Sequence, residues 1–147
     1  MSERENILFL FDILIAIEKI KDIVKDYKNA EELLYSYRDW DALIREFEII
    51  GEAMKNCIDA GIFENNKNKR KVVDFRNILI HKYFGIDPQA VLNIAKENLY
   101  WLEDIVVQKI KSLEMSKRNE LLEYLINENH YLPFVVNRLQ KLKNESK

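Results

Sequence analysis

The sequence has little of what builds disulfide-rich, β-rich or disordered proteins. Its 147 residues include one cysteine, three glycines and two prolines. A single cysteine, Cys57, excludes an intrachain disulfide framework and a cysteine-based zinc site. So few turn-forming residues argue against a many-stranded sandwich, and a hydrophobic content of 48% argues against disorder. The composition therefore favours a helical protein.

Strong net charge and long apolar runs are also absent. The formal net charge is -2 and the pI is near 5.8, so any contact with nucleic acid must be local. The most apolar stretch, residues 7–17, contains Asp12 and is shorter than the roughly 20 residues that cross a bilayer. No small-residue cleavage site of a secretory signal accompanies it. We therefore expect a cytoplasmic protein that contacts no membrane.

Apolar residues recur every three or four positions along most of the chain, which is the spacing of one helical face. The pattern predicts helices over about 7–24, 29–61 and 71–84, then 88–113, with one or two more beyond. A break is expected near 37–41, with Asp39 or Asp41 as the cap of the longer part. Asp87 followed by Pro88 predicts a well-defined helix start.

Short loops between long helices favour antiparallel neighbours. We expect an all-α fold, an up-and-down bundle over residues 1–113. Residues 114–147 are expected to be a C-terminal helical extension of the same domain, because a chain of this length suits one domain.

The segment 76–83, RNILIHKY, gives its predicted helix two different faces. One face is apolar and suited to the core; it carries Val72, Phe75, Ile78 and Leu79. The other mixes polar and apolar side chains; it carries Arg76, Asn77, Ile80, His81, Tyr83 and Phe84. Apolar residues beside polar groups on an outward face suggest burial against another chain. An identical chain is the simplest partner, so we expect a homodimer through this face.

The polar residues of this face suit RNA cleavage. Histidine has an ordinary pKa near 6.5, so His81 is a candidate base for a ribose 2′-hydroxyl. Arg76 is a candidate ligand for the scissile phosphate, and Asn77 can orient the imidazole or donate to a phosphate oxygen. The products would be a 2′,3′-cyclic phosphate and a 5′-hydroxyl. This chemistry requires no metal and no cofactor.

The residues alone also allow plainer interpretations. A lone helical histidine beside hydrophobic residues is more often structural than catalytic, and an arginine such as Arg76 is usually a surface ion pair. A helical tyrosine is usually a core or interface residue. A structural bundle of unrelated type therefore stays open as a hypothesis at this point.

The spacing of Arg76, His81 and Tyr83 resembles the R-x4-H-x-Y signature of HEPN domains, specifically the HepT-like toxins (the DUF86 group). Asn77 supplies the polar residue that commonly follows the arginine. Two further segments are similar to the same group, Gly51-Glu52-Ala53 and Phe84-Gly85-Ile86-Asp87. The likeness covers about residues 6–113.

The resemblance implies a homodimeric, metal-independent ribonuclease toxin that acts on RNA such as tRNA or mRNA. It also implies a partner, a minimal nucleotidyltransferase (MntA-like) antitoxin, which would neutralise the toxin by binding it and by transferring AMP to Tyr83. The alternative is a non-catalytic HEPN module that binds the nucleotidyltransferase, a nucleotide or both.

Four further residues are candidates for supporting roles. Glu52 could orient His81 or pair with Arg76; the alternative is a solvated glutamate. Lys69, Arg70 and Lys71 lie in a basic run before the motif and could contact RNA backbone, although a solvated loop explains the run as well.

Overall fold

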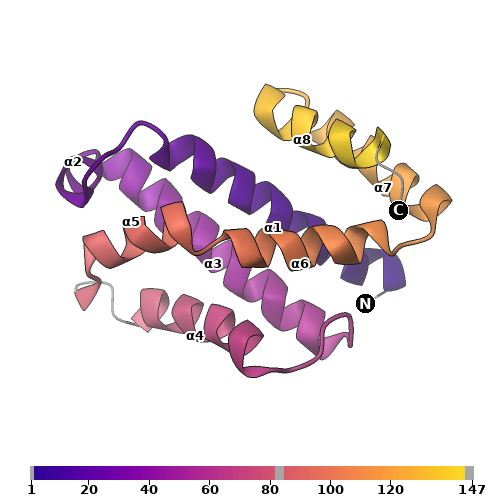
Figure 1. Ribbon diagram of the computed structural model, residues 1–147, viewed down its shortest axis with the longest axis horizontal. Coiled ribbons are helices and arrows are strands. Elements are labelled where there is room, and N and C mark those ends of the chain that lie inside the picture. The colour runs from indigo at the N-terminus through magenta and orange to yellow at the C-terminus, as the bar shows by residue number, and fades with distance from the viewer. Residues whose placement is uncertain (1, 82–84, 145–147) are drawn as a thin grey trace.

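The computed structural model describes residues 2–81 and 85–144, and within these ranges it holds eight α-helices and no strand (Figure 1). The helices are α1 (Glu3–Val24), α2 (Ala30–Tyr35), α3 (Tyr37–Asp59), α4 (Lys67–His81), α5 (Pro88–Glu97), α6 (Tyr100–Lys111), α7 (Met115–Glu128) and α8 (Pro133–Asn144). None of the described helices is long and apolar enough to cross a membrane.

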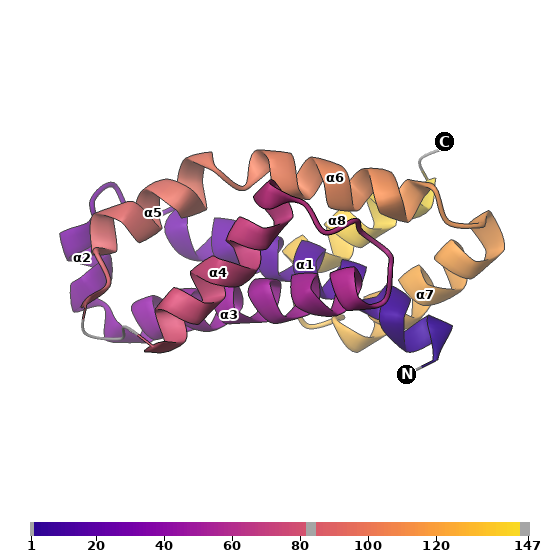
Figure 2. The ribbon, with the colours of Figure 1, turned by 90° about the horizontal axis from the view of Figure 1, so that it is seen from below.

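The bundle is built around α1, which packs against α3, α5, α6 and α8. Its buried residues follow the predicted stripe: Ile7, Leu10, Phe11, Leu14, Ile17, Ile20 and Val24. α3 runs antiparallel to α1, and α4 runs back along α3 (Figure 1). Seen from below, α5 and α6 lie along one side of the molecule and α3 along the other (Figure 2). The all-α antiparallel bundle is thus confirmed.

Two helix boundaries agree with the sequence pattern. α3 gives way to Gly61, whose φ of 76° lies in the left-handed region that glycine adopts without steric cost. Before α5, the Asp87 side chain accepts a hydrogen bond from the Gln89 N–H at 3.0 Å, and Pro88 takes the first helical position. Both signals depend on local backbone chemistry, so the sequence reveals them without any tertiary information.

The break in the second predicted helix lies at Ser36, not within 37–41. Ser36 leaves the helical conformation, with φ −88° and ψ 72°, and its N–H donates to the carbonyls of Glu32 and Leu33. The prediction that Asp39 caps the longer part is wrong, because its carboxylate accepts a hydrogen bond from the Tyr27 hydroxyl instead. Asp41 is not the cap either, since α3 begins before it.

The predicted helix over 88–113 is also divided, between α5 and α6, at Asn98 and Leu99. Asn98 has φ −103° and ψ 3°, and its N–H closes the last turn on the Ile94 carbonyl at 3.0 Å. Asparagine is a weak helix former because its side chain competes for backbone hydrogen bonds. Leu99, at the break between α5 and α6, is buried in the core.

The two C-terminal helices form a hairpin on α1 and α6. Arg138 of α8 contacts the Glu18 carboxylate of α1 at 3.5 Å and the Glu103 carboxylate of α6 at 3.6 Å. Lys21 contacts the same two carboxylates. All three Arg138, Glu18 and Glu103 side chains are mostly buried, at 15–20% exposure. This charge cluster joins residues on both sides of position 113. The division of the chain into a bundle over 1–113 and an extension over 114–147 stays a prediction.

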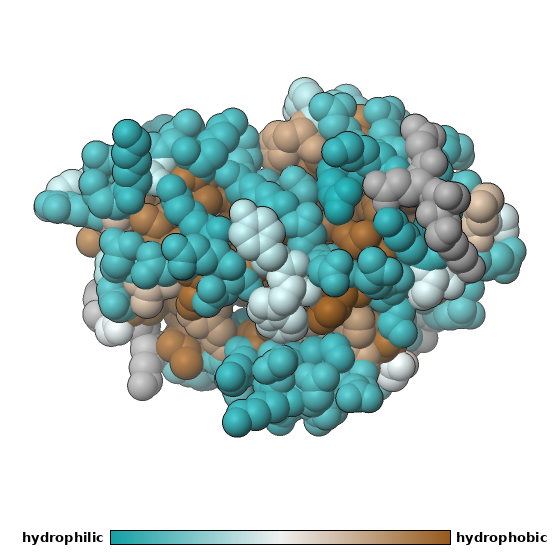
Figure 3. Space-filling view, in the orientation of Figure 1, coloured by the Kyte–Doolittle hydropathy of each residue, from teal (hydrophilic) through white to brown (hydrophobic). Residues whose placement is uncertain are grey.

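α4 is attached to the bundle mainly through α3. Phe75 packs edge-on against Phe47 of α3, with ring centroids 5.2 Å apart. The expected core face is only partly correct: Leu79 is buried and Val72 and Phe75 are half-buried, but Ile78 is 47% exposed. Val73, which was not expected on this face, is buried as well. Apolar surface remains open between α4 and the helices α5 and α6 (Figure 3), where a groove of about 400 Å³ includes Ile78 in its lining.

Candidate active site on the motif helix

The motif helix starts at Lys67, earlier than the predicted residue 71. Asn66 fixes this start, because its side-chain oxygen accepts a hydrogen bond from the Lys69 N–H at 3.0 Å and its carbonyl accepts one from the Arg70 N–H at 2.9 Å. Asparagine is among the preferred residues at such a position. The basic run is therefore the first turn of α4 and not a loop.

Gly51 of α3 allows the motif helix to come close at the level of Arg76. A Cβ atom at residue 51 would lie 2.1 Å from the Arg76 Cβ, 2.7 Å from its Cγ and 3.3 Å from the Val72 carbonyl oxygen. Real side-chain atoms do not approach so closely. The absent side chain of Gly51 thus sets how deeply the stem of Arg76 sits against α3.

The guanidinium of Arg76 is held from two sides. Its Nη2 lies 2.9 Å from the Glu52 carboxylate of α3, and its Nη1 donates to the Asn77 side-chain oxygen at 2.9 Å. The Arg76 side chain is 29% exposed, so part of the group stays open to a ligand. Of the two contacts expected for Glu52, the structure contains the one with Arg76.

His81 lies on the surface, one helical turn after Asn77. It is the last described residue of α4 and is exposed, so its ring does not lie inside its own subunit. Asn77 and His81 are four residues apart, which places them on one stripe of the helix. Tyr83, the expected site of AMP transfer, lies outside the described residues. The structure therefore brings together Arg76, Asn77 and Glu52, with His81 on the adjoining turn.

The three basic candidates do not form one patch. Lys69 places its ammonium 5.2 Å from the centre of the Phe63 ring, and Arg70 is exposed. Lys71 lines the apolar groove on the other side of α4. Lys69 precedes Arg76 by seven residues, which is two turns and roughly 10 Å along the helix axis on the same side. Of the three, Lys69 is best placed to continue a surface that starts at Arg76.

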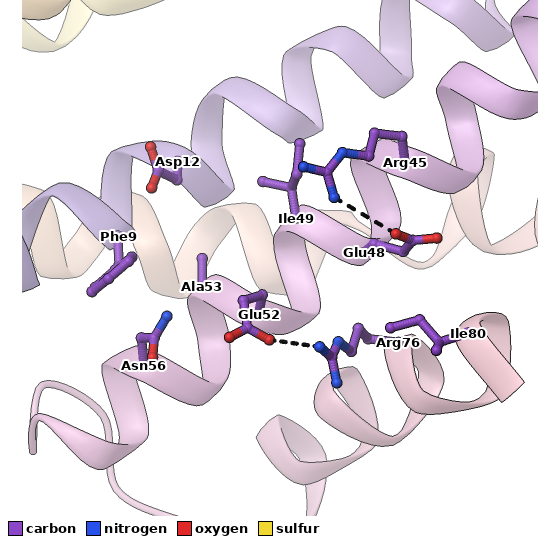
Figure 4. Close-up of a pocket in the computed structure, with 10 residues that line it drawn as sticks. All are labelled: Phe9, Asp12, Arg45, Glu48, Ile49, Glu52, Ala53, Asn56, Arg76 and Ile80. Carbon is purple, nitrogen blue, oxygen red and sulfur yellow. Dashed lines mark ion pairs between the residues drawn. The ribbon is translucent and has the colours of Figure 1, made fainter.

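A pocket beside Arg76 was not foreseen from the sequence. It holds about 190 Å³ along α3, between α1 and α4 (Figure 4), and we call it the α3 pocket. Its lining residues are Phe9, Asp12, Arg45, Glu48, Ile49, Glu52, Ala53, Asn56, Arg76 and Ile80. The lining residues from α3 recur at helical spacing, which the sequence shows. How they lie against α1 and α4 depends on the packing of the three helices, and the sequence does not show that packing.

The charges of the α3 pocket are partly paired. Arg45 contacts Glu48 at 3.6 Å, and Glu52 contacts Arg76 (Figure 4). Asp12 is accessible to solvent, yet burial among its neighbours raises the pKa of its carboxyl group. Within residues 2–81 and 85–144, no group of three or more His, Cys, Asp or Glu side chains is arranged to hold a metal ion.

The fold and this arrangement of side chains define a protein class. The family model described as "Ribonuclease HepT-like" matches residues 13–109, which is most of the bundle and includes the whole motif. The chain belongs to the HepT-like ribonuclease family.

Curated relatives agree with this assignment. A Methanocaldococcus jannaschii protein named "Gamma-glutamylcyclotransferase and putative RNase" is 30% identical over 92% of this chain and 62% of its own length. Another, named "Putative RNase", is 39% identical over 67% of this chain and 91% of its own length. A Thermococcus cleftensis protein named "Probable ribonuclease HepT" is 35% identical over 62% of this chain and 83% of its own length. The chain thus spans under two thirds of the first relative. No solved structure matches.

Proposed function

We propose that the chain is a metal-independent endoribonuclease toxin, neutralised by a minimal nucleotidyltransferase that transfers AMP to Tyr83. One observation carries the proposal. In a member of the HepT-like family, the guanidinium of Arg76 is held at the rim of a pocket, with the exposed imidazole of His81 on the adjoining turn. Cleavage through a 2′-hydroxyl needs a group that binds the phosphate and a group that accepts the hydroxyl proton.

The proposed reaction is an internal transfer at phosphorus. His81 takes the proton of the ribose 2′-hydroxyl, and the 2′-oxygen forms a bond to the adjacent phosphorus. The bond from phosphorus to the 5′-oxygen of the next nucleotide breaks, and the imidazolium returns a proton to that oxygen. Arg76 neutralises the charge that develops on the phosphate oxygens. The products are a 2′,3′-cyclic phosphate and a 5′-hydroxyl.

Glu52 and Asn77 have positioning roles in this proposal. Both bond the guanidinium through its Nη atoms, at 2.9 Å each. An arginine fixed in this way does not have to lose side-chain freedom when the phosphate arrives, so binding costs less entropy. Asn77 also stands one turn before His81 and can direct the imidazole.

Cleavage of labelled tRNA and mRNA by the purified chain tests the activity. Wild-type protein, free of any modification at Tyr83, is expected to leave 2′,3′-cyclic phosphate ends, and His81→Ala is expected to abolish them. His130→Ala is the matched control, because His130 is an exposed histidine in the turn between α7 and α8, away from the motif in sequence. RNA left intact by unmodified wild-type protein, with partner binding preserved, would establish the non-catalytic module instead.

The proposed homodimer places two motif helices face to face. Ile80 lies on the same face of α4 as Arg76 and is 42% exposed, and this exposed apolar side chain beside the polar groups supports burial against a partner chain. Ile80→Asp is expected to convert a dimer to a monomer in light scattering. Leu34→Asp on α2 is the matched control, since Leu34 is 41% exposed and far from the motif in sequence. An Ile80→Asp protein that stays dimeric would move the interface elsewhere.

The proposed neutralisation is a transfer of an adenylyl group. The Tyr83 oxygen attacks the α-phosphorus of ATP, pyrophosphate leaves, and the phenolic proton passes to solvent. The intact mass of the protein produced with the nucleotidyltransferase should exceed that of protein made alone by one or more adenylyl units. Tyr83→Phe should remove this increment, whereas Tyr131→Phe, at an exposed tyrosine outside the motif, should not. An increment that survives Tyr83→Phe would contradict the assigned site.

A further inference from the structure

The α3 pocket adjoins Arg76, the proposed binding group for the phosphate, on the side away from His81. Arg76 and Ile80 form its α4 wall, whereas Asn77 and His81 belong to the next stripe of the helix and are not among its lining residues. Phe9 and Asp12 of α1 form the opposite wall, and Figure 4 shows Asn56 between these walls at the far end from Arg45. A phosphate on Arg76 would therefore have the imidazole on one side and this pocket on the other.

The size and lining of the α3 pocket suit one flat polar ring. Its 190 Å³ is below the roughly 300–1,000 Å³ of pockets that take drug-sized ligands. Phe9 and Ile80 contribute apolar surface, and the polar groups are carboxylates, an amide and two guanidinium groups. Proteins bind single-stranded RNA bases with such mixtures, by packing the ring against apolar or aromatic groups and bonding its edge.

The polar groups of the α3 pocket favour one base over the others. Glu48 and Glu52 are each in contact with an arginine, but Asp12 makes no hydrogen bond or ion pair within the described part of the chain. Asp12 therefore has both carboxylate oxygens available as acceptors. Guanine presents two adjacent donors, N1–H and N2–H, that one carboxylate can accept together. Its O6 and N7 atoms are acceptors that arginine commonly binds, and Arg45 lies in the same pocket.

We propose that the α3 pocket binds a guanine base of the RNA, next to the phosphate held by Arg76. Asp12 accepts from the Watson–Crick edge, and Arg45 is the donor available for O6 or N7. Adenine, cytosine and uracil each lack the pair of adjacent donors, so the pocket discriminates against them. This inference rests on the proposed function for its substrate, but it concerns recognition and not cleavage.

Binding of short RNAs to the full chain carrying His81→Ala tests recognition without turnover. The probes are an oligouridine with one central guanosine and its counterparts with adenosine, cytidine or inosine at that position, followed by fluorescence anisotropy. Inosine lacks only the N2 amino group. The guanosine probe should bind about tenfold more tightly than the adenosine and cytidine probes, because a two-bond base contact discriminates by about that factor. The inosine probe keeps the N1–H donor but loses the N2 donor, so its affinity should lie between these.

Asp12→Asn in the same background should remove this preference, since an amide offers only one acceptor oxygen. Asp22→Asn, also on α1, is the matched control: Asp22 pairs with Lys25 and is not part of the pocket. Circular dichroism melting of Asp12→Asn establishes that the variant folds. If Asp12→Asn does not fold, the inosine comparison in the parent protein decides alone.

The two proposals fail in different ways. Equal binding of guanosine and inosine probes overturns guanine recognition, whatever the protein does to RNA. A guanosine preference in a protein whose wild-type form cuts no RNA supports the pocket and overturns the nuclease. If the wild type cuts RNA but the probes bind equally, the nuclease proposal is supported and guanine recognition by the α3 pocket is ruled out.

Discussion

Gly51 and Arg76 pack so closely that the backbone of α3 lies against the aliphatic stem of the motif arginine. A methyl group on Gly51 would stand 2.1 Å from the Arg76 Cβ. One residue later, Glu52 bonds the guanidinium at the other end of the same side chain. The segment Gly51-Glu52 therefore fixes both the depth and the direction of Arg76.

Gly51→Ala is expected to force α3 and α4 apart. Overfilling a packed contact typically costs about 1–3 kcal/mol of folding stability, and the displaced Arg76 should also reduce RNA cleavage. Chemical denaturation and cleavage rates measure the two effects. Gly85→Ala is the control for stability, because a Cβ there meets no atom within 4 Å. Unchanged stability in Gly51→Ala would show that the helices do not pack as described.

Glu52→Gln should reduce activity much more than stability. The side chain is 48% exposed, and ion pairs at such sites contribute less than about 1 kcal/mol to folding. Its role is to direct the guanidinium, and a misplaced catalytic group can lower the rate by about tenfold to a hundredfold. Cleavage kinetics and thermal melting separate the effects. The control is Glu123→Gln, whose partner Lys143 lies on α8. Full activity in Glu52→Gln would leave Arg76 positioned by Asn77 alone.

Arg138→Met should loosen the C-terminal hairpin. It leaves Glu18 and Glu103 without their contact from α8 while both carboxylates stay mostly buried. Lys21 still contacts both, so the loss should be about 1–3 kcal/mol, below the roughly 3–5 kcal/mol for a buried charge that loses its partner entirely. Urea unfolding measures this loss. Lys143→Met, at the pair with the exposed Glu123, is the control and should cost less than about 1 kcal/mol.

The cost of Arg138→Met should also depend on pH. Burial raises the pKa of Glu18, and the contacts with Lys21 and Arg138 oppose that rise. A carboxyl group with a raised pKa in the folded state loses stability as the pH increases, since the charged form is disfavoured there. Without Arg138 the pKa of Glu18 should rise further. The difference in unfolding free energy between the variant and the wild type should therefore be smallest near about pH 4 and should grow as the pH increases toward neutrality.

Cys57 should be unreactive in the folded protein. It is fully buried, and burial raises the pKa of its thiol to about 12, with the nearby Asp12 carboxylate as a smaller cause. Alkylation requires the thiolate, so iodoacetamide should label Cys57 only after unfolding in guanidinium. Because the folded state resists ionisation of this thiol, stability should decline as the pH rises above about 9. Rapid labelling of native protein would contradict this burial.

The sequence predicted the bundle well because helical periodicity and end signals are local. The stripe from Ile7 to Val24 and the cap at Asp87 both depend on neighbouring residues alone. The breaks at Ser36 and Asn98 were misplaced or missed, since each is decided by contacts with other helices or by backbone bonds with weak sequence signals.

The candidate site was predictable only in part. Spacing placed Arg76, Asn77 and His81 on one helix, and similarity drew attention to Gly51 and Glu52. The role of Gly51 as a contact surface for Arg76 requires the crossing of two helices, which periodicity does not contain. The α3 pocket was missed for the same reason, because Asp12 on α1 is separated in sequence by 33 residues or more from the α3 and α4 residues that line the pocket with it.

The hairpin of α7 and α8 lies at the other end of the long axis from the C-terminal end of the motif helix (Figure 1). Exposed residues there, such as Tyr124 and Met115, can be replaced by cysteine for coupling to a dye or a sensor chip. Such a handle leaves Arg76, His81 and the α3 pocket facing the solution. Surface-based measurements of RNA and partner association therefore have a ready point of immobilisation.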